Sequence, residues 1–313
     1  MTWLEVLSPG LLTTAQDLGR EGFGPMGVSP SGAADPIALR IGNRLVGNAE
    51  GAAALEMTLV GGTFAFPQGA VAALTGSDFG ATLDGVVISP WASFGVKPGQ
   101  TLRLGPTRSG ARCYLCVHGG IAVDPFLGSA STHLLSGLGG HDGRALRQGD
   151  VLRIRSAARR SFHPRRVAAK ALERLAPRKI LRVTQGPQCD WFPKAAQKTL
   201  YDATYRVSEE ANRMGLRLEG PAIPGGAHGE MISEGVSLGA IQIAAGGLPI
   251  ILFVEQQTTG GYAKIANVIS ADLSSLGQLR PRNEVRFELV GLETARKRLI
   301  EQEKLLASED LIV

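Results

Sequence analysis

Short stretches in which apolar and polar residues alternate recur along this chain, separated by turns rich in Gly and Pro. Three of them resemble one another: residues 96–104 (VKPGQTLRL), 146–153 (LRQGDVLR) and 279–287 (LRPRNEVRF). Each has a polar turn followed by alternating apolar residues, which predicts a hairpin that leads into a barrel strand. With 41 Gly, 17 Pro and few aromatic residues, the pattern predicts a mostly β protein.

Helical periodicity is restricted to a few short stretches. Residues 35–45 (DPIALRIGNRL) have an acidic cap, then Pro, then apolar residues at helical spacing, which predicts a helix that begins after Asp35. Residues 293–306 (ETARKRLIEQEKLL) predict a second helix with a charged, solvated face. Residues 167–175 (VAAKALERL) predict a third, shorter helix.

A basic stretch interrupts the β pattern and predicts a domain boundary. We expect a first β domain at residues 1–158, a linker at 159–177 and a second β domain at 178–313. A weaker echo pairs residues 41–48 (IGNRLVGN) with 210–220 (EANRMGLRLEG). Together with the three turn-and-strand segments, it suggests two related domains that resemble β-barrels.

The net charge of +5 does not indicate a nucleic-acid partner. The positive charge is concentrated between Arg153 and Arg182 without the aromatic residues that stack on bases, so a solvated linker or an anion-facing surface is the better interpretation. Residues 1–10 lack a signal-like start, and no apolar run approaches the roughly 20 residues of a membrane span. We expect a cytoplasmic protein that acts without nucleic acid or membrane.

The three cysteines predict no metal site. Cys113 and Cys116 form a CxxC inside an apolar run, and in a strand positions three apart face opposite sides, so a structural role is favoured over a zinc or redox site. Walker and HExxH motifs do not occur. GFGPMG (residues 22–27) and GVSLG (residues 235–239) match two further motifs but lack the strand-turn-helix context that those motifs require.

Polar segments next to predicted strands supply candidate binding residues. Residues 10–35 contain Ser31 and Asp35, and either line a substrate pocket or form a plain loop in which Asp35 caps the following helix. Asn212 lies next to Arg213, which either clamps a carboxylate or phosphate or pairs with Glu219 or Glu230. His118 is interpreted as a hydrogen-bonded structural residue.

Residues 255–264 (EQQTTGGYAK) form the most informative segment. The apolar residues 248–254 predict a strand that ends at this segment, where backbone amides of a flexible Gly260-Gly261 turn could bind an anion and Lys264 could neutralise a carboxylate. A tight hairpin is the alternative. The catalytic candidates are Lys264, Glu255 and Gln257. The substrate-binding candidates are Ser31, Asp35, Asn212, Arg213, Thr258, Thr259, Gly260, Gly261 and Tyr262.

Several long motifs, in the same order, resemble one known family over nearly the whole chain. They are PGLLTTAQDLGREGFGPMGV, PSGAADPIALRIGNRLVGN, LEMTLVGG, GPQCDWF, ANRMGLRLEGP, SEGVSLGAIQI and QQTTGGYAKIANVISADLSSLGQLRP. The family is described as allophanate hydrolase subunit two, or subdomains A and B of the biotin-dependent carboxyltransferase domain of urea amidolyase. It includes the C subunit of the ATP-dependent 5-oxoprolinase and the antagonist protein of the Kip kinase inhibitor.

This resemblance implies two cyclophilin-like β-barrel domains and a partner subunit that carries subdomains C and D. It implies a subunit of an ATP-dependent amide hydrolase of 5-oxoprolinase type, acting on a small cyclic or linear amide. The alternatives are a carboxyltransferase subunit that acts on urea with biotin on a separate carrier, or a non-catalytic antagonist of a kinase inhibitor. The sequence departs from the family at Glu255, usually Asp, at Ala211, usually Ser, and at residues 281–283, Pro-Arg-Asn where Pro-Gly-Asp is usual.

Overall fold

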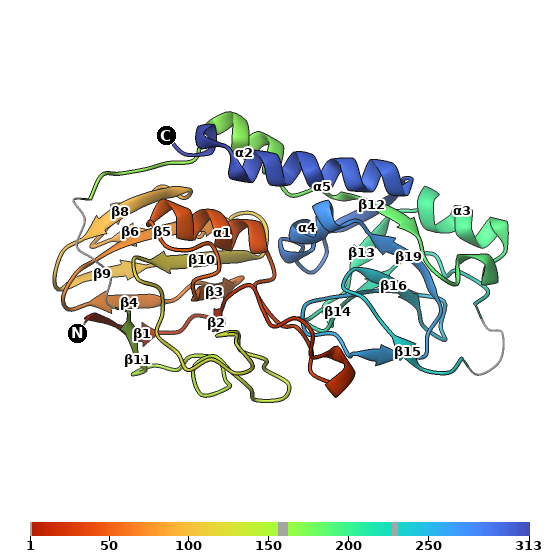
Figure 1. Ribbon diagram of the computed structural model, residues 1–313, viewed down its shortest axis with the longest axis horizontal. Coiled ribbons are helices and arrows are strands. Elements are labelled where there is room, and N and C mark those ends of the chain that lie inside the picture. Colours follow the sequence, from red (N-terminus) through yellow and green to blue (C-terminus); the bar gives the residue numbers. More distant parts are fainter. Residues whose placement is uncertain (1, 156–161, 227–230) are drawn as a thin grey trace. The chain divides into compact units, whose positions relative to one another are not determined.

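The computed structural model describes residues 2–155, 162–226 and 231–313 and divides into two compact units (Figure 1). Unit 1 comprises Met1–Arg20, Ser31–Arg174 and Leu306–Val313, and unit 2 comprises Glu21–Pro30 and Leu175–Leu305. These limits differ from the predicted ones, because residues 21–30 belong to unit 2 and residues 306–313 to unit 1. That residues 1–158 and 178–313 are the limits of independently folding domains stays a prediction.

Unit 1 consists of two antiparallel sheets with a hydrophobic core between them. One sheet has the order β11-β1-β4-β9-β6-β7, with β1 (Thr2–Ser8), β4 (Thr63–Phe66), β6 (Thr82–Leu83), β7 (Val86–Val87), β9 (Gln100–Arg103) and β11 (Val151–Ile154). The other has the order β2-β3-β10-β5-β8, with β2 (Leu12–Gln16), β3 (Ala54–Thr58), β5 (Ala70–Gly76), β8 (Ala92–Val96) and β10 (Arg112–Val117). Leu4, Phe64 and Leu102 of the first sheet share the core with Leu55, Met57 and Leu115 of the second.

Strand β2 corrects the interpretation of residues 10–35 as one polar loop. Thr13, Thr14 and Gln16 are buried, and β2 pairs with β3 along its whole length. Their polar side chains are hydrogen-bonded, Thr13 to the carbonyl of Pro9 and Gln16 to the carbonyl of Thr132. A polar stretch can therefore form a buried strand at the edge of the sheet. Hydrophobic alternation could not reveal it.

Helix α1 (Pro36–Leu45) covers the outer face of the five-stranded sheet (Figure 1). Its predicted start is confirmed, because the Asp35 carboxylate accepts a hydrogen bond of 3.0 Å from the N–H of Ala38. Cys113 lies in the core between the sheets, whereas Cys116 faces α1, its sulfur 3.9 Å from the carbonyl of Leu39. The two thiols therefore point to opposite faces of β10, as predicted, and burial raises the pKa of both.

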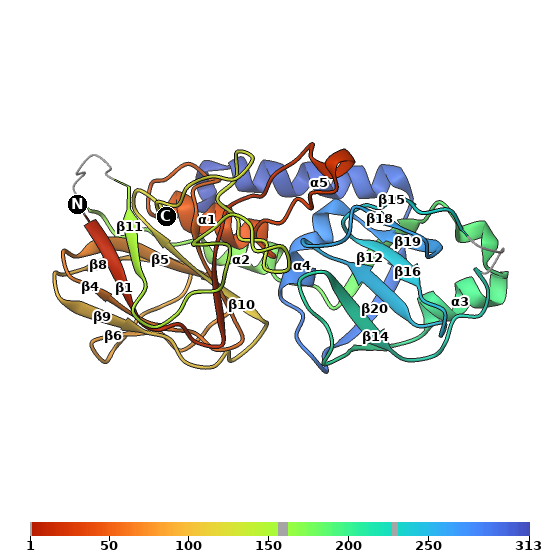
Figure 2. The same ribbon diagram turned by 90° about the horizontal axis from the view of Figure 1, so that it is seen from below.

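Unit 2 is built on a closed barrel with the order β12-β19-β16-β17-β14-β13-β20 (Figure 2). The strands are β12 (Ile180–Gln185), β13 (Tyr205–Val207), β14 (Gly215–Glu219), β16 (Ala240–Ile243), β17 (Pro249–Leu252), β19 (Lys264–Val268) and β20 (Glu284–Leu289). All neighbours are antiparallel except β12 and β20. β15 (Glu234–Gly235) and β18 (Thr259–Gly260) form a separate two-stranded ladder. The predicted mostly β fold with short helices is thus confirmed.

The remaining helices lie outside the sheets. The predicted short and C-terminal helices are α2 (Ala169–Leu175) and α5 (Leu292–Ala307), while α3 (Lys194–Asp202) and α4 (Leu273–Gly277) were not predicted. Short 3-10 turns occur at Gly24–Met26, Cys189–Trp191, Ser270–Asp272 and Glu309–Leu311. None of the helices in the described ranges is long and apolar enough to cross a membrane.

The three resembling segments contain the same turn but are not hairpins. In each, the N–H of the fourth turn residue donates to the carbonyl of the first residue. The side-chain oxygen of the fourth residue accepts a hydrogen bond from the N–H of the first. This holds for residues 97–100, 147–150 and 280–283. The strands that follow are β9, β11 and β20, and none of them pairs with the element before the turn. The prediction of a hairpin is wrong, since the turn only starts a strand.

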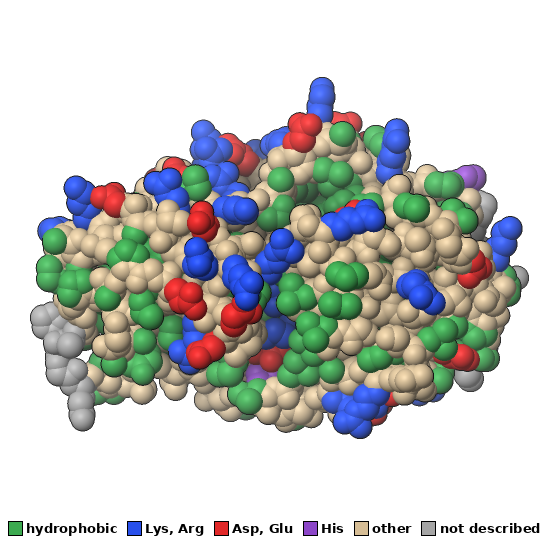
Figure 3. Space-filling model, turned by 180° about the vertical axis from the view of Figure 1, so that it is seen from behind, with side chains coloured by type: hydrophobic (Ala, Val, Ile, Leu, Met, Phe, Trp, Pro, Cys, Tyr) green, Lys and Arg blue, Asp and Glu red, His purple; other side chains and the backbone are tan. Residues whose placement is uncertain are grey.

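The weaker echo does not reflect a shared structure. Residues 41–45 are helical in α1, whereas residues 215–219 form β14. The basic stretch lies partly outside the described residues, which omit 156–161. Its described part belongs to unit 1 up to Arg174 and to unit 2 from Leu175. In unit 1 the N–H groups of Arg166 and Val313 each donate a 2.8 Å hydrogen bond to the other residue's carbonyl. Figure 3 shows Lys and Arg side chains spread over one face, several of them beside Asp and Glu side chains. The absence of a nucleic-acid partner stays a prediction.

Candidate functional site

Lys264 is the first residue of β19 and is held by the loop that follows β12. Its N–H donates to Gln188 Oε1 at 3.1 Å, and its carbonyl accepts from the N–H of Gln188 at 3.2 Å. Gly186 makes this approach possible, because a Cβ there would lie 2.3 Å from the Lys264 carbonyl oxygen. The glutamine side chain is thereby fixed beside the lysine.

The ammonium group of Lys264 pairs with a carboxylate from β15. Lys264 Nζ lies 2.5 Å from Glu234 Oε1, and Gln188 Nε2 donates to the same oxygen at 2.8 Å. These hydrogen bonds, the one from Lys264 first, lower the pKa of Glu234 below its ordinary value. The Lys264 side chain is 5% exposed and that of Glu234 46%. The cluster of Lys264, Glu234 and Gln188 thus combines a buried cation with an accessible carboxylate.

The segment around Gly260 does not form the flexible turn or tight hairpin that the sequence suggested. Thr259 and Gly260 form β18, which pairs with Glu234 and Gly235 of β15, and neither Gly260 nor Gly261 has a positive φ. A Cβ on Gly260 would lie 2.6 Å from Gln242 Nε2. Glycine is needed here for close packing on a glutamine. Because β18 is paired with β15, its amides do not form the predicted anion-binding turn.

Three other candidate residues of the same segment, Gln257, Thr258 and Tyr262, lie in the same part of unit 2. The carbonyl of Thr258 accepts from the N–H of Val236 at 3.2 Å, and Gln257 Nε2 lies 3.4 Å from the position of a Cβ on Gly260. Tyr262 is 48% exposed. Its carbonyl accepts from Gln242 Nε2 at 3.4 Å. Thr258, Gln257 and Tyr262 thus lie near β15, the strand that carries Glu234, the partner of Lys264.

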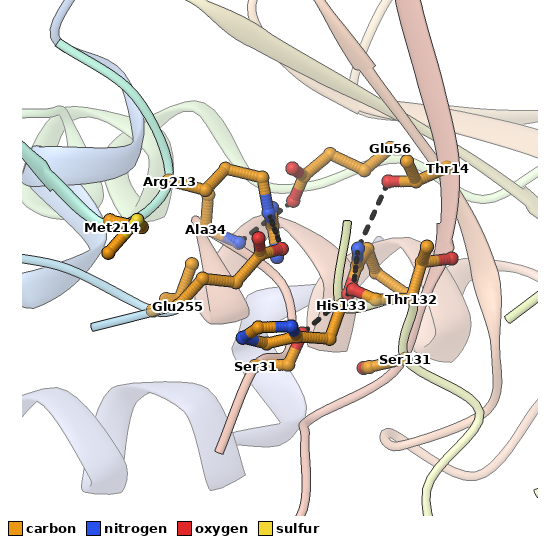
Figure 4. Close-up of polar contacts among 12 residues, drawn as sticks. Thr14, Ser31, Ala34, Glu56, Ser131, Thr132, His133, Arg213, Met214 and Glu255 are labelled. Atoms are coloured by element: carbon orange, nitrogen blue, oxygen red, sulfur yellow. Dashed lines mark hydrogen bonds and ion pairs between the residues drawn. The ribbon is translucent and has the colours of Figure 1, made fainter. Parts of the chain in front are cut away.

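Arg213 and Glu255 form a buried ion pair, drawn in Figure 4. Arg213 Nε lies 2.5 Å from Glu255 Oε1, and the two side chains are 5% and 3% exposed. A backbone bond of 2.8 Å from the N–H of Glu255 to the Arg213 carbonyl joins the same residues. The prediction that Arg213 forms an ion pair is correct, but the partners predicted from the sequence were Glu219 or Glu230. Glu219 points outward from β14, and Glu230 lies outside the described residues.

Asn212 has a local structural role. Its Oδ1 accepts a hydrogen bond of 2.8 Å from the N–H of Met214, so the side chain stabilises the turn that leads into β14. The chain direction at Arg213 is set by this turn. As a substrate-binding residue, Asn212 stays a prediction.

Ser31 and Asp35 belong to unit 1 and are both buried. The Ser31 hydroxyl donates to the carbonyl of Thr132 at 2.8 Å, as Figure 4 shows, and Asp35 caps α1. The N–H of Asp35 also donates to the hydroxyl of Tyr114 at 2.8 Å. Both residues make structural contacts in unit 1, which favours the capping interpretation of Asp35.

A buried carboxylate close to these residues escaped the sequence interpretation. Glu56 Oε2 accepts from the Tyr114 hydroxyl at 2.6 Å and from the N–H of Ala34 at 2.8 Å. Arg112 Nε lies 3.6 Å from Glu56 Oε1. Burial, followed by the charge of Glu56, raises the pKa of Tyr114 well above its ordinary value. Glu56 thus organises the start of α1 on the sheet.

Gln188 and Glu234 also escaped the sequence interpretation, although both lie inside the recognised motifs GPQCDWF and SEGVSLGAIQI. Their order along the chain gives no sign that they meet Lys264. His118 was interpreted correctly, since its Nδ1 lies 2.8 Å from the Val46 carbonyl oxygen. Over the part of the chain that the structure describes, no group of three or more His, Cys, Asp or Glu side chains is arranged to hold a metal ion.

The family model and the similar proteins point to the same family. Residues 26–289 match the family described as carboxyltransferase domain, subdomain A and B. The chain is 38% identical to the C subunit of 5-oxoprolinase from Escherichia coli (strain K12), and the match covers 96% of both proteins. It is 35% identical to urea amidolyase of Saccharomyces cerevisiae over 99% of this chain but 18% of that protein.

Solved structures agree with these relatives. The structure of TTHA0988 has a TM-score of 0.82 and 38% identity, and the match covers 92% of this chain and 55% of that one. The urea amidolyase of K. lactis has a TM-score of 0.89 and 32% identity, with 99% of this chain and 21% of that one covered. The chain therefore spans about half of the first protein and a fifth of the second. On this evidence the chain belongs to the family of carboxyltransferase domains, subdomains A and B.

Proposed function

We propose that this chain is a subunit of an ATP-dependent amide hydrolase of the 5-oxoprolinase type, acting with a partner subunit that carries subdomains C and D. The similarity to the 5-oxoprolinase C subunit, at 38% identity over 96% of both proteins, supports this choice. Within the chain, the cluster of Lys264, Glu234 and Gln188 carries the proposal.

The exposure of the two acidic partners favours Lys264 over Arg213 as the cation that holds a substrate carboxylate. Arg213 is paired with Glu255, whose side chain is only 3% exposed, and separating a buried pair costs several kcal/mol. Glu234 is 46% exposed, so a substrate carboxylate can replace it on Lys264 at small cost. Gln188 offers an amide beside that position for a substrate carbonyl.

The nucleotide is assigned to the complex and not to this chain. ATP, when bound, would activate the substrate amide by phosphorylation. The glycine-rich GFGPMG forms a short 3-10 turn at Gly24–Met26 and does not open an α-helix, whereas phosphate-binding loops of that pattern precede a helix N-terminus. The chain's own residues would bind and orient the amide, while the partner supplies the nucleotide site.

Urea carboxylation with biotin on a separate carrier is the second candidate. It is favoured by the K. lactis urea amidolyase structure, which has a TM-score of 0.89 over 99% of this chain. One experiment separates the two functions: co-expression with the partner, then assay of 5-oxoproline opening and of urea carboxylation, each with and without ATP and biotin. ATP-dependent opening of 5-oxoproline without biotin supports the first candidate. Activity on urea alone, dependent on biotin, overturns it.

The role of Lys264 is tested in the same assembled complex. We expect Lys264→Met to lower kcat/KM at least about tenfold, because a charge-assisted hydrogen bond contributes about 1.5–3 kcal/mol. Lys198→Met is the matched control, since its side chain is 77% exposed on α3. Unchanged kcat/KM in Lys264→Met, with the complex intact by size-exclusion chromatography, would remove this assignment.

A further inference from the structure

Unit 1 contains a cavity of about 410 Å³ that the proposed function does not use. Its walls are residues 122–124 with Phe126, the loop from Gly139 to Gly143, and residues 151–153 of β11. Figure 1 shows the long connection between β10 and β11, coloured yellow-green, from which the first two walls come. Cavities of about 300–1,000 Å³ are typical of small-molecule sites.

The loop from Gly139 to Gly143 presents free backbone amides. It is closed by a 2.8 Å hydrogen bond from the N–H of Gly143 to the carbonyl of Gly139. Within the described chain, the four N–H groups of residues 139–142 donate no hydrogen bond. The φ angles of Gly139, Gly140, Asp142 and Gly143 are +63°, +57°, +54° and +66°, and that of His141 in the middle is not positive. The change of sign on either side of His141 turns the N–H groups of residues 140–142 toward one point, which makes an anion-binding concavity.

Side chains of both charges line the same cavity. Arg153 points outward from β11 on the same side as Val151, and Asp124 is exposed on the wall formed by residues 122–124. Neither side chain makes a hydrogen bond or ion pair within the described ranges. An anion-binding loop and an Arg together favour a carboxylate. An unpaired Asp disfavours a polyanion and favours a ligand that also carries a positive charge.

Asp150 lies beside His141 and is held by several hydrogen bonds. His141 Nε2 lies 3.6 Å from Asp150 Oδ1 and 3.8 Å from Asp142 Oδ2. Arg144 holds both oxygens of Asp150 at 2.8 and 2.9 Å, and the N–H of Arg147 donates to the same carboxylate at 2.7 Å. Asp150 is therefore held in place beside His141 at the end of the loop.

We propose that this cavity binds a small zwitterion of the α-amino acid type, with its carboxylate toward the loop amides and Arg153 and its ammonium group toward Asp124. The proposal is independent of the partner subunit and of the hydrolase activity. A failure of either proposal is therefore distinguishable from a failure of the other.

The test uses the full chain alone and L-glutamine as the probe, since its side chain is polar but adds no charge. Isothermal titration is expected to show saturable binding of L-glutamine. N-acetyl-L-glutamine, which lacks the ammonium group, and inorganic phosphate are each expected to bind at least about tenfold more weakly. Absence of L-glutamine binding overturns the proposal. Equal affinity for phosphate or for the acetylated probe also overturns it, because that result describes a plain anion site.

Variants connect the binding to the cavity. Arg153→Gln and Asp124→Asn are each expected to raise the Kd for L-glutamine about tenfold or more. Both side chains are exposed, so the fold is retained, which circular dichroism checks. Arg155→Gln is the matched control, because Arg155 follows β11 and does not line the cavity, and its Kd is expected to be unchanged. An unchanged Kd in Arg153→Gln would place any binding elsewhere and overturn the proposal.

Discussion

At the scale of single residues, Arg282 is a departure from the family pattern that keeps the backbone of the turn but places a side chain in the left-handed region. It is the third residue of the turn at 280–283, and its φ is +70°. Gly99 and Gly149 occupy the same place in the two equivalent turns of unit 1, with φ of +83° and +89°. A side chain is strained in this conformation by about 1 kcal/mol. The ion pair between Arg282 and Glu209 is exposed, so it offsets little of that strain.

We therefore expect Arg282→Gly to raise the free energy of unfolding by about 1 kcal/mol, measured by urea denaturation. The reciprocal change in an equivalent turn, Gly149→Arg, is the control and should lower the free energy of unfolding by a similar amount. A loss of stability in Arg282→Gly would show that its surface contacts outweigh the backbone strain.

The buried pair of Arg213 and Glu255 gives a second prediction at this scale. Glu255→Gln removes the negative charge from this buried pair, so the free energy of unfolding should fall by about 3 kcal/mol. Glu210→Gln is the control, because Glu210 is exposed and lies 3.6 Å from Arg217, where a pair contributes under about 0.5 kcal/mol. Similar losses in the two variants would contradict a special role for burial.

At the scale of elements, α1 shows which helices the sequence can predict. Asp35 and Pro36 mark its beginning chemically, and its apolar residues follow helical spacing. The start of α3 lacks a side-chain cap, and its buried residues Ala196 and Leu200 depend on packing against β20. Tertiary contacts stabilise most short helices. For that reason α1 was predicted and α3 was not.

The contact of α1 with its sheet leads to a prediction that opposes helix propensity. Replacing Gly42 by Ala inside a helix should gain about 1 kcal/mol. The added Cβ would, however, lie 2.6 Å from Cys116 Sγ and 2.8 Å from Thr75 Oγ1, and overpacking costs about 1–3 kcal/mol. We expect Gly42→Ala to lower the free energy of unfolding by about 1 kcal/mol.

A double-mutant cycle with Cys116→Ala checks the cause of that loss. Removing the sulfur makes room for the new methyl group, so the double variant should be at least about 0.5 kcal/mol more stable than additivity predicts. Additive losses would instead locate the strain elsewhere, for example at Thr75. Chemical denaturation of all four proteins supplies the measurement.

At the scale of the whole molecule, unit 1 is completed by the last residues of the chain. The N–H of Ala168 donates to the carbonyl of Leu311 at 3.0 Å, and Val167 forms a bridge with Ile312. Leu311 is completely buried. The C-terminal residues therefore stabilise a segment that the sequence predicted to be a solvated linker.

Leu311→Ala should accordingly lower the free energy of unfolding by about 2–4 kcal/mol, as for other buried leucines. Val313→Ala is the control, because Val313 is 62% exposed, and its effect should stay below about 0.5 kcal/mol. Equal and small effects in the two variants would mean that the C-terminus is not part of the folded unit. Thermal and chemical denaturation both report the difference.

The sequence by itself determined the β class, the capped helix α1, the opposite faces of Cys113 and Cys116 and the family, because each depends on local periodicity, local chemistry or motif order. It did not determine that residues 12–16 form a buried strand, because the strand follows no apolar alternation and the side chain of Gln16 is satisfied by a hydrogen bond to the distant Thr132. Only the tertiary structure decided that Lys264 meets Glu234 and Gln188, and that Arg213 meets Glu255. Barrel closure brings together residues 30 to 76 positions apart, and no local pattern carries that information.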